Sequence, residues 1–151
     1  MVSASDTNPN CRDFCEANYP GNFVHFYASI EEQLAADKPC VFCASGPFGE
    51  YAEVCKAEKE LRAGQSVQLL VTGSPCDPFS TQRAKRFESG DVKTHYQFHI
   101  TMQKVLDMYL NFEPEKGILE QVWGFCLPFE KHGTETPKQK LLGCTEWLVL
   151  S

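Results

Sequence analysis

The chain has no long apolar run, no internal repeat and no excess of positive charge. No stretch approaches the roughly 18 apolar residues that a membrane-spanning helix needs, and the polar opening 1–10 lacks the basic start and apolar core of a secretory signal. The formal net charge of -6 disfavours broad attraction to nucleic acid, because that affinity comes from Lys and Arg neutralising phosphates. These absences predict an intracellular globular protein, and 151 residues is a common size for a single domain.

Cysteine is abundant, with 8 residues in the chain. Without a secretory signal, reduced thiols are favoured over a disulfide framework, because the redox compartment decides this more than the count does. Each cysteine is then by default a small buried hydrophobe. Basic side chains gather in one place, just after Cys76, at Arg83, Lys85, Arg86 and Lys93.

Short apolar runs alternate with stretches of helical spacing. Runs 67–72 and 117–122, bounded by glycine or turn residues, predict buried strands, and 22–27 is a weaker strand candidate. Apolar spacings of three and four predict a helix over 94–110, and composition favours helices over 50–62 and 11–18. The polar tail 130–140 is expected to be a loop before the apolar segment 147–150.

This alternation predicts an α/β fold with a mainly parallel sheet and flanking helices, formed by one domain over 1–151. In such sheets the site lies beyond the carboxyl ends of the strands. Directly after strand 67–72 comes Gly73-Ser74-Pro75-Cys76-Asp77-Pro78-Phe79-Ser80. Its prolines restrict the backbone, so the thiol of Cys76 is presented in few orientations, as a nucleophile requires. The alternative interpretation of the octapeptide is a turn with an ordinary buried cysteine.

This octapeptide resembles the nucleophile loop Gly-x-Pro-Cys-x-x-Phe-Ser of the cytosine-5 DNA methyltransferase family. The segment Glu120-Gln121-Val122 in the second strand resembles the family's Glu-Asn-Val segment. Further similar pieces are Arg86-Phe87-Glu88, Phe112-Glu113-Pro114 and the helix end at 14–21. The resemblance covers most of the chain, but only the Pro-Cys loop is highly specific to the family.

The resemblance implies a partial Rossmann-like fold of the S-adenosylmethionine-dependent methyltransferases, truncated at both ends. It implies that Cys76 attacks carbon 6 of a flipped-out cytosine and that Glu120 binds or protonates ring nitrogen 3. S-adenosylmethionine is the implied cofactor, DNA or possibly RNA the implied partner, and the nucleus of a eukaryote the implied location, with no metal expected. The implied contacts are Ser74, Pro75 and Ser29 for the cofactor and Ser80, Arg83, Lys85 and Arg86 for nucleic acid.

The chain departs from the family pattern in three places. The family's Phe-x-Gly-x-Gly cofactor loop has no counterpart before Cys11, and Gly46-Pro47-Phe48-Gly49 is a weak substitute. Gln121 replaces the usual Asn, and Ser29 or Ala28 stands where an acidic residue is usual. A second hypothesis is therefore an inactive remnant that acts as a binding protein, and a third is a relative of transfer-RNA cytosine-5 methyltransferases.

Other side chains suggest weaker alternatives. Cys40-x-x-Cys43 with Cys55, and Cys11 or Cys15, is half of a structural zinc site, but no second pair has a standard spacing, which favours free thiols. His95 and His99 are four apart and could chelate a metal, although surface histidines are the favoured interpretation. A redox role for Cys76 lacks a resolving cysteine nearby in sequence.

Overall fold

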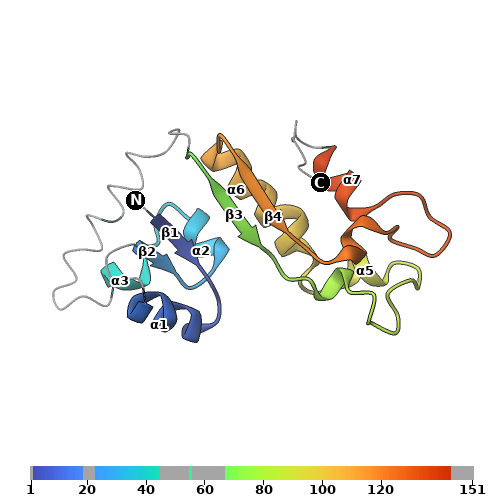
Figure 1. The fold of residues 1–151 in the computed structure, drawn as a ribbon, viewed down its shortest axis with the longest axis horizontal. Coiled ribbons are helices and arrows are strands. Elements are labelled where there is room, and N and C mark those ends of the chain that lie inside the picture. Colours follow the sequence, from blue (N-terminus) through green and yellow to red (C-terminus); the bar gives the residue numbers. More distant parts are fainter. Residues whose placement is uncertain (1, 19–22, 45–54, 56–66, 144–151) are drawn as a thin grey trace. The chain divides into compact units, whose positions relative to one another are not determined.

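Two pairs of parallel strands organise the chain in the computed structural model, which describes residues 2–18, 23–44, 55 and 67–143. The chain divides into two compact units, Met1–Gln65 and Ser66–Ser151, each with one strand pair (Figure 1). The α/β class and the parallel pairing are thus confirmed, and the Rossmann-like sheet and the single domain stay predictions. The loop 46–49, the segment 147–150 and, apart from Cys55, the predicted helix 50–62 lie outside the described residues.

The first unit has a strand, a helix and a second, parallel strand, followed by two short helices. The elements are β1 (Val2–Ser5), α1 (Pro9–Asn18), β2 (Phe23–Tyr27), α2 (Ile30–Leu34) and α3 (Val41–Ala44). Strand β1 pairs with β2 over its whole length, with Ser5 opposite Tyr27. Tyr27, Cys40 and Cys55 form the buried cluster of this unit.

The second unit has two parallel strands separated by a long helical connection. The elements are β3 (Leu70–Gly73), η1 (Asp77–Phe79), α5 (Asp91–Thr94), the π-helical turn η2 (Ile100–Lys104), α6 (Val105–Phe112), β4 (Gly117–Glu120), η3 (Trp123–Cys126) and α7 (Pro137–Leu142). Strands β3 and β4 pair from Leu70 opposite Gly117 to Gly73 opposite Glu120. Strand β4 lies inside the predicted run 117–122, and β3 overlaps the predicted run 67–72 and extends one residue past it to Gly73.

Helix α6 packs along the β3–β4 pair (Figure 1). The hydroxyl of Tyr109 on α6 donates to the carbonyl of Ile118 at 3.1 Å and lies 3.4 Å from Oγ1 of Thr72, so the helix contacts both strands. Burial raises the pKa of Tyr109, which therefore stays a neutral hydrogen-bond donor. Val71 and Ile118, opposite each other in register, are exposed.

A core of aromatic and aliphatic side chains lies beyond the ends of these strands. Its buried members are Phe79, Val92, Phe125, Phe129 and Leu141. The rings of Phe79 and Phe125 meet edge to face, with their centroids 5.0 Å apart, a favourable arrangement for aromatic quadrupoles. Because Phe79 belongs to η1, this core fixes the loop that follows β3. None of the described helices is long and apolar enough to cross a membrane.

Two elements differ from the sequence prediction. The predicted helix 94–110 is interrupted, because α5 ends at Thr94 and the helical path resumes only at Phe98, then passes through η2 into α6. The predicted loop 130–140 contains the first residues of α7. This helix begins with a capping box in which Thr136 and Gln139 bond reciprocally, with Pro137 at its first position.

Candidate functional site

In the loop after β3, Cys76 is exposed while the residues that follow it, Pro78 and Phe79, are buried. Cys76 is an exposed free cysteine at the N-cap of η1, and its carbonyl accepts a hydrogen bond from the amide of Phe79 at 2.9 Å. The two residues before Ser80 in this loop, Pro78 and Phe79, are fully buried. The thiol is therefore solvent-accessible while the backbone beneath it is anchored in the core. That combination suits a nucleophile held in one orientation.

Glu120 ends β4 at the same edge of the strand pair. It is opposite Gly73 in register, and its Oε2 lies 3.6 Å from where a Cβ on Gly73 would be. Strands β3 and β4 are parallel, so their carboxyl ends, one leading to Cys76 and the other carrying Glu120, are adjacent. The two residues that the resemblance singled out thus lie on neighbouring strand ends, although they are more than 40 residues apart in the sequence.

Ser74 is the point at which the two strand ends are joined by hydrogen bonds. The side-chain amide of Gln121 donates to the carbonyl and the hydroxyl of Ser74, at 2.7 and 2.8 Å. The hydroxyl of Thr101, a fully buried residue, donates to Oγ of Ser74 at 3.0 Å and contacts the carbonyl of Pro75 at 3.4 Å. The backbone leading into Cys76 is thus held from β4 and from η2.

Two of the predicted phosphate-binding arginines contact this loop instead. Arg86 is fully buried, and its guanidinium donates to the carbonyls of Phe79, Phe129 and Gly124 at 3.2, 3.1 and 2.9 Å. Burial, together with the nearby positive charge of Arg83, lowers the pKa of Arg86. The prediction that Arg86 contacts nucleic acid is therefore wrong in this structure, because the side chain has no exposed surface.

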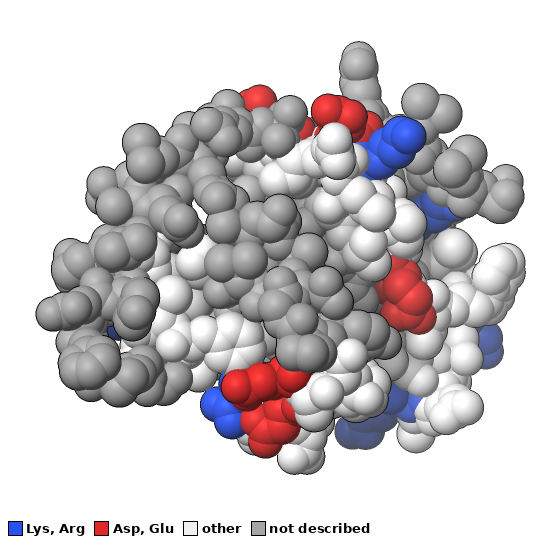
Figure 2. Space-filling model, turned by 60° about the vertical axis from the view of Figure 1, so that its left-hand side comes forward, with Lys and Arg blue, Asp and Glu red and all other residues white. Residues whose placement is uncertain are grey.

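Arg83 is half-buried and also has local partners. Its guanidinium donates to the carbonyl of Pro78 at 3.0 Å and forms an ion pair of 2.6 Å with Asp91. Lys85 is exposed and Ser80 half-buried, so both remain available as predicted contacts. On the face drawn in Figure 2, acidic and basic side chains lie next to one another in the described part of the surface.

Ser29, the third predicted cofactor contact, ends the turn after β2. It is the N-cap of α2, and its hydroxyl accepts a hydrogen bond from the amide of Glu32 at 3.2 Å. Beside it lies an open depression of about 440 Å³. Its lining residues are Ala28, Glu32, Lys38, Pro39, Val41 and Ala44. An apolar wall with a few polar groups is the usual lining of a small-molecule site.

The paired histidines do not form a chelating pair on one helical face. His95 is the C-cap of α5 and its Nε2 lies 3.3 Å from the carboxylate of Asp77, while His99 lies past the helix break and is exposed. The side chain of His95 therefore points toward η1. This contact links the connection between the strands to Asp77, the residue that follows Cys76.

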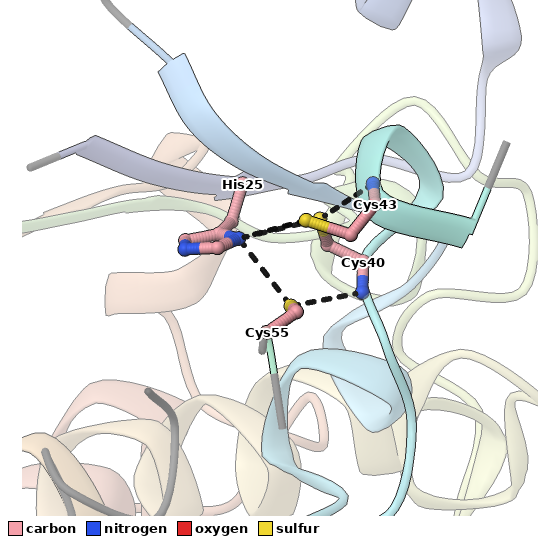
Figure 3. Close-up of side chains that lie close together, drawn as sticks. All are labelled: His25, Cys40, Cys43 and Cys55. Atoms are coloured by element: carbon pink, nitrogen blue, oxygen red, sulfur yellow. Dashed lines mark hydrogen bonds between the residues drawn. The ribbon is translucent and has the colours of Figure 1, made fainter. Parts of the chain in front are cut away.

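A second group of reactive side chains lies in the first unit and includes a residue that the sequence prediction did not consider. His25, Cys40, Cys43 and Cys55 converge so that their ligand atoms all lie within 4.8 Å of one another (Figure 3). Nδ1 of His25 is 3.3 Å from Sγ of Cys40, 3.4 Å from that of Cys55 and 3.8 Å from that of Cys43. From the sequence, Cys40, Cys43 and Cys55 were named as possible zinc ligands, with Cys11 or Cys15 as the fourth, and His25 was missed.

Burial dominates the electrostatics of this cluster. It raises the pKa of the Cys43 thiol, and the adjacent sulfurs of Cys40 and Cys55 raise it further. Burial also raises the pKa of Tyr27, with the neighbouring Cys55 sulfur adding to the effect. The raised pKa values keep Cys43 and Tyr27 protonated near neutral pH.

We compared the chain with known protein families, curated proteins and solved structures. No protein-family model, no curated protein and no solved structure matches the chain. The functional argument therefore depends on the residues and geometry described above.

Proposed function

We propose that this chain is a cytosine-5 DNA methyltransferase-like protein in which Cys76 is the nucleophile and Glu120 its acidic partner. The observation that supports it is the parallel register of β3 and β4, which pairs Gly73 with Glu120. That register makes the exposed Cys76 loop and the exposed carboxylate of Glu120 neighbours at one sheet edge. The likeness of 73–80 and 120–122 to the family's loop and its Glu-Asn-Val segment supplies the chemistry.

In the proposed reaction the thiolate of Cys76 adds to carbon 6 of a cytosine, which makes carbon 5 nucleophilic. Glu120 donates a proton or hydrogen bond to ring nitrogen 3 and so stabilises the electron density that the addition pushes into the ring. S-adenosylmethionine, when bound, supplies the methyl group. Loss of the carbon 5 proton to a base then expels the thiolate of Cys76 and restores the aromatic ring.

The remaining residues of the loop have positioning roles in this proposal. Gln121 and Thr101 hold Ser74, and Arg86 holds the carbonyl of Phe79, so the backbone on both sides of Cys76 is fixed. Ser29 is assigned to the cofactor by the resemblance alone, and its hydroxyl caps α2. Lys85, exposed and close in sequence to the loop, is the proposed phosphate contact.

The test is covalent trapping on an oligonucleotide that carries 5-fluorocytosine, with S-adenosylmethionine present, because fluorine cannot leave carbon 5 as a proton does. We expect an adduct that survives a denaturing gel. Cys76→Ala should abolish it, whereas Cys126→Ala, which removes another exposed thiol, should leave it intact. Glu120→Gln should slow adduct formation by about 10²-fold or more.

Matched DNA and transfer-RNA substrates separate the two nucleic-acid classes. An adduct with RNA alone would replace DNA by transfer RNA as the substrate. If folded protein forms no adduct with either substrate, the proposed activity is refuted, and calorimetry with S-adenosylmethionine then tests whether a binding function remains.

A further inference from the structure

We propose that His25, Cys40, Cys43 and Cys55 bind a structural zinc ion. The four residues supply one imidazole nitrogen and three sulfurs, a donor set that suits zinc. They come from β2, from the N-terminal end and body of α3, and from Cys55 further along the chain. The side chains point inward to a common centre (Figure 3).

The distances fit a tetrahedral site. Zinc binds sulfur at about 2.3 Å and nitrogen at about 2.0–2.1 Å, so neighbouring nitrogen and sulfur ligands of a tetrahedron are about 3.6 Å apart. The three observed separations from Nδ1 of His25 are 3.3, 3.4 and 3.8 Å. All four ligand atoms lie within 4.8 Å of one another, and neighbouring sulfurs around a tetrahedral zinc are about 3.8 Å apart, so binding of the ion draws the sulfurs closer together.

Burial indicates a structural site and not a catalytic one. The exposed fractions of Cys40, Cys55 and His25 are 0%, 2% and 6%. Four protein ligands complete a tetrahedral shell, whereas a catalytic zinc keeps one position for water or substrate. An ion at this centre is therefore enclosed by protein ligands.

Hydrogen-bond donors around the sulfurs also suit thiolates. The amide of Cys43 donates to Sγ of Cys40 at 3.3 Å, and the amide of Cys40 donates to Sγ of Cys55 at 3.4 Å. The hydroxyl of Tyr27 lies 3.9 Å from Sγ of Cys55. Donors placed on ligand sulfurs orient them and stabilise their negative charge once the metal is bound.

The site also explains how the first unit is held together. Its buried cluster consists of Tyr27 and two of the proposed ligands, Cys40 and Cys55, with Phe42 and Cys43 packed beside them. Cys40 and Cys55 are thus ligands and buried cluster residues at once, and metal binding commonly contributes to the folding of small domains. The three cysteines lie 15 to 30 residues after His25 in the sequence, so a bound ion would connect distant parts of the first unit.

The experiment is metal analysis of the full chain, purified without chelators or a histidine tag. We expect about one equivalent of zinc per chain, and its replacement by cobalt should give the intense visible bands of a tetrahedral thiolate complex. Cys40→Ser and His25→Ala should lose the metal. His25→Cys, which restores a fourth ligand, should keep it.

Cys11→Ser and Cys15→Ser are the matched controls, because these cysteines lie on α1, outside the cluster. They should retain full zinc. Where a ligand variant does not fold, X-ray absorption of the zinc in the unmodified protein decides the question, with three sulfurs and one nitrogen expected. Folded protein without zinc and without a cobalt spectrum, or a disulfide between cluster cysteines, would overturn the proposal. None of these readouts depends on methyltransferase activity.

Discussion

The side chain of Gln121 binds both the carbonyl and the hydroxyl of Ser74, at 2.7 and 2.8 Å, and so fastens the end of β4 to the loop after β3. The other amide atom, Oε1, is buried and has no hydrogen-bond partner among the described residues. A buried acceptor left in this state costs free energy. Gln121 stands where the cytosine-5 methyltransferases have Asn. Its amide nitrogen binds Ser74 while its amide oxygen is left without a hydrogen-bond partner among the described residues.

We expect Gln121→Leu to loosen the loop. It removes two hydrogen bonds but also the unpartnered Oε1, so the free energy of unfolding should fall by only about 1 kcal/mol. Adduct formation through Cys76 should fall further, by about 10²-fold, because a displaced nucleophile loses its alignment. Urea unfolding and trapping on 5-fluorocytosine measure the two effects, with the exposed Gln82→Leu as control. Equal activity of both variants would contradict a positioning role for Gln121.

Gly124 is a position where no side chain fits. A Cβ there would lie 1.8 Å from the carbonyl oxygen of Phe79, a backbone atom that cannot rotate away. Gly124→Ala should therefore push η3 away from the loop and lower the free energy of unfolding by about 3 kcal/mol or more. Gly133→Ala, whose Cβ would meet its nearest neighbour at 3.5 Å, is the matched control and should unfold like the unmodified chain. A normal melting temperature for Gly124→Ala would show that the close approach is absent.

The strands that the sequence predicted share strong local signals. Residues of β3 and β4 are apolar and bounded by glycine, and β2 is aromatic and β-branched. Strand β1 was not predicted, because Val2-Ser3-Ala4-Ser5 is short and half polar and becomes a strand only by pairing with β2. Its existence depends on a partner about 20 residues away, which no local pattern contains.

Helix α7 was missed for a different reason. Its start carries a readable signal, Thr136 followed by Pro137 and by Gln139 three residues after the cap, but the polar composition of 130–140 favoured a loop. The apolar residues at helical spacing begin only at Phe98, so the pattern did not support extending the helix back across 95–97 to Thr94. Periodicity indicates which face is buried and does not exclude an interruption.

The residues of the candidate site also fall into those that the sequence identified and those that only the structure revealed. Cys76 and Glu120 were identified through local sequence, and β3 and β4 bring their strand ends together. Arg86 was assigned to nucleic acid as one of the basic residues that follow Cys76, and only tertiary structure reveals the carbonyls that surround it. The sequence named Cys40, Cys43 and Cys55 as candidate zinc ligands, but His25 lies 15 residues before Cys40 and carries no local signal.

Arg86→Met should destabilise the second unit strongly. The variant keeps a long apolar side chain but leaves the buried carbonyls of Phe79, Gly124 and Phe129 without their donor. We expect a loss of about 3 kcal/mol or more in the free energy of unfolding. Lys85→Met, on the exposed side of the same segment, should leave stability within about 0.5 kcal/mol and weaken binding of an oligonucleotide at low salt. Equal stability of the two variants would refute the structural role of Arg86.

Thiol labelling should divide the cysteines into two groups. Cys76 and Cys126 are exposed, whereas Cys40 and Cys55 are buried, so iodoacetamide followed by peptide mass spectrometry should modify the first pair well before the second. If zinc holds the cluster, a strong chelator should expose Cys40, Cys43 and Cys55 to labelling while leaving the rate at Cys76 unchanged, because Cys76 belongs to the other unit. A chelator that altered no labelling rate would argue against the metal, whereas early labelling of Cys40 in untreated protein would contradict the buried cluster itself.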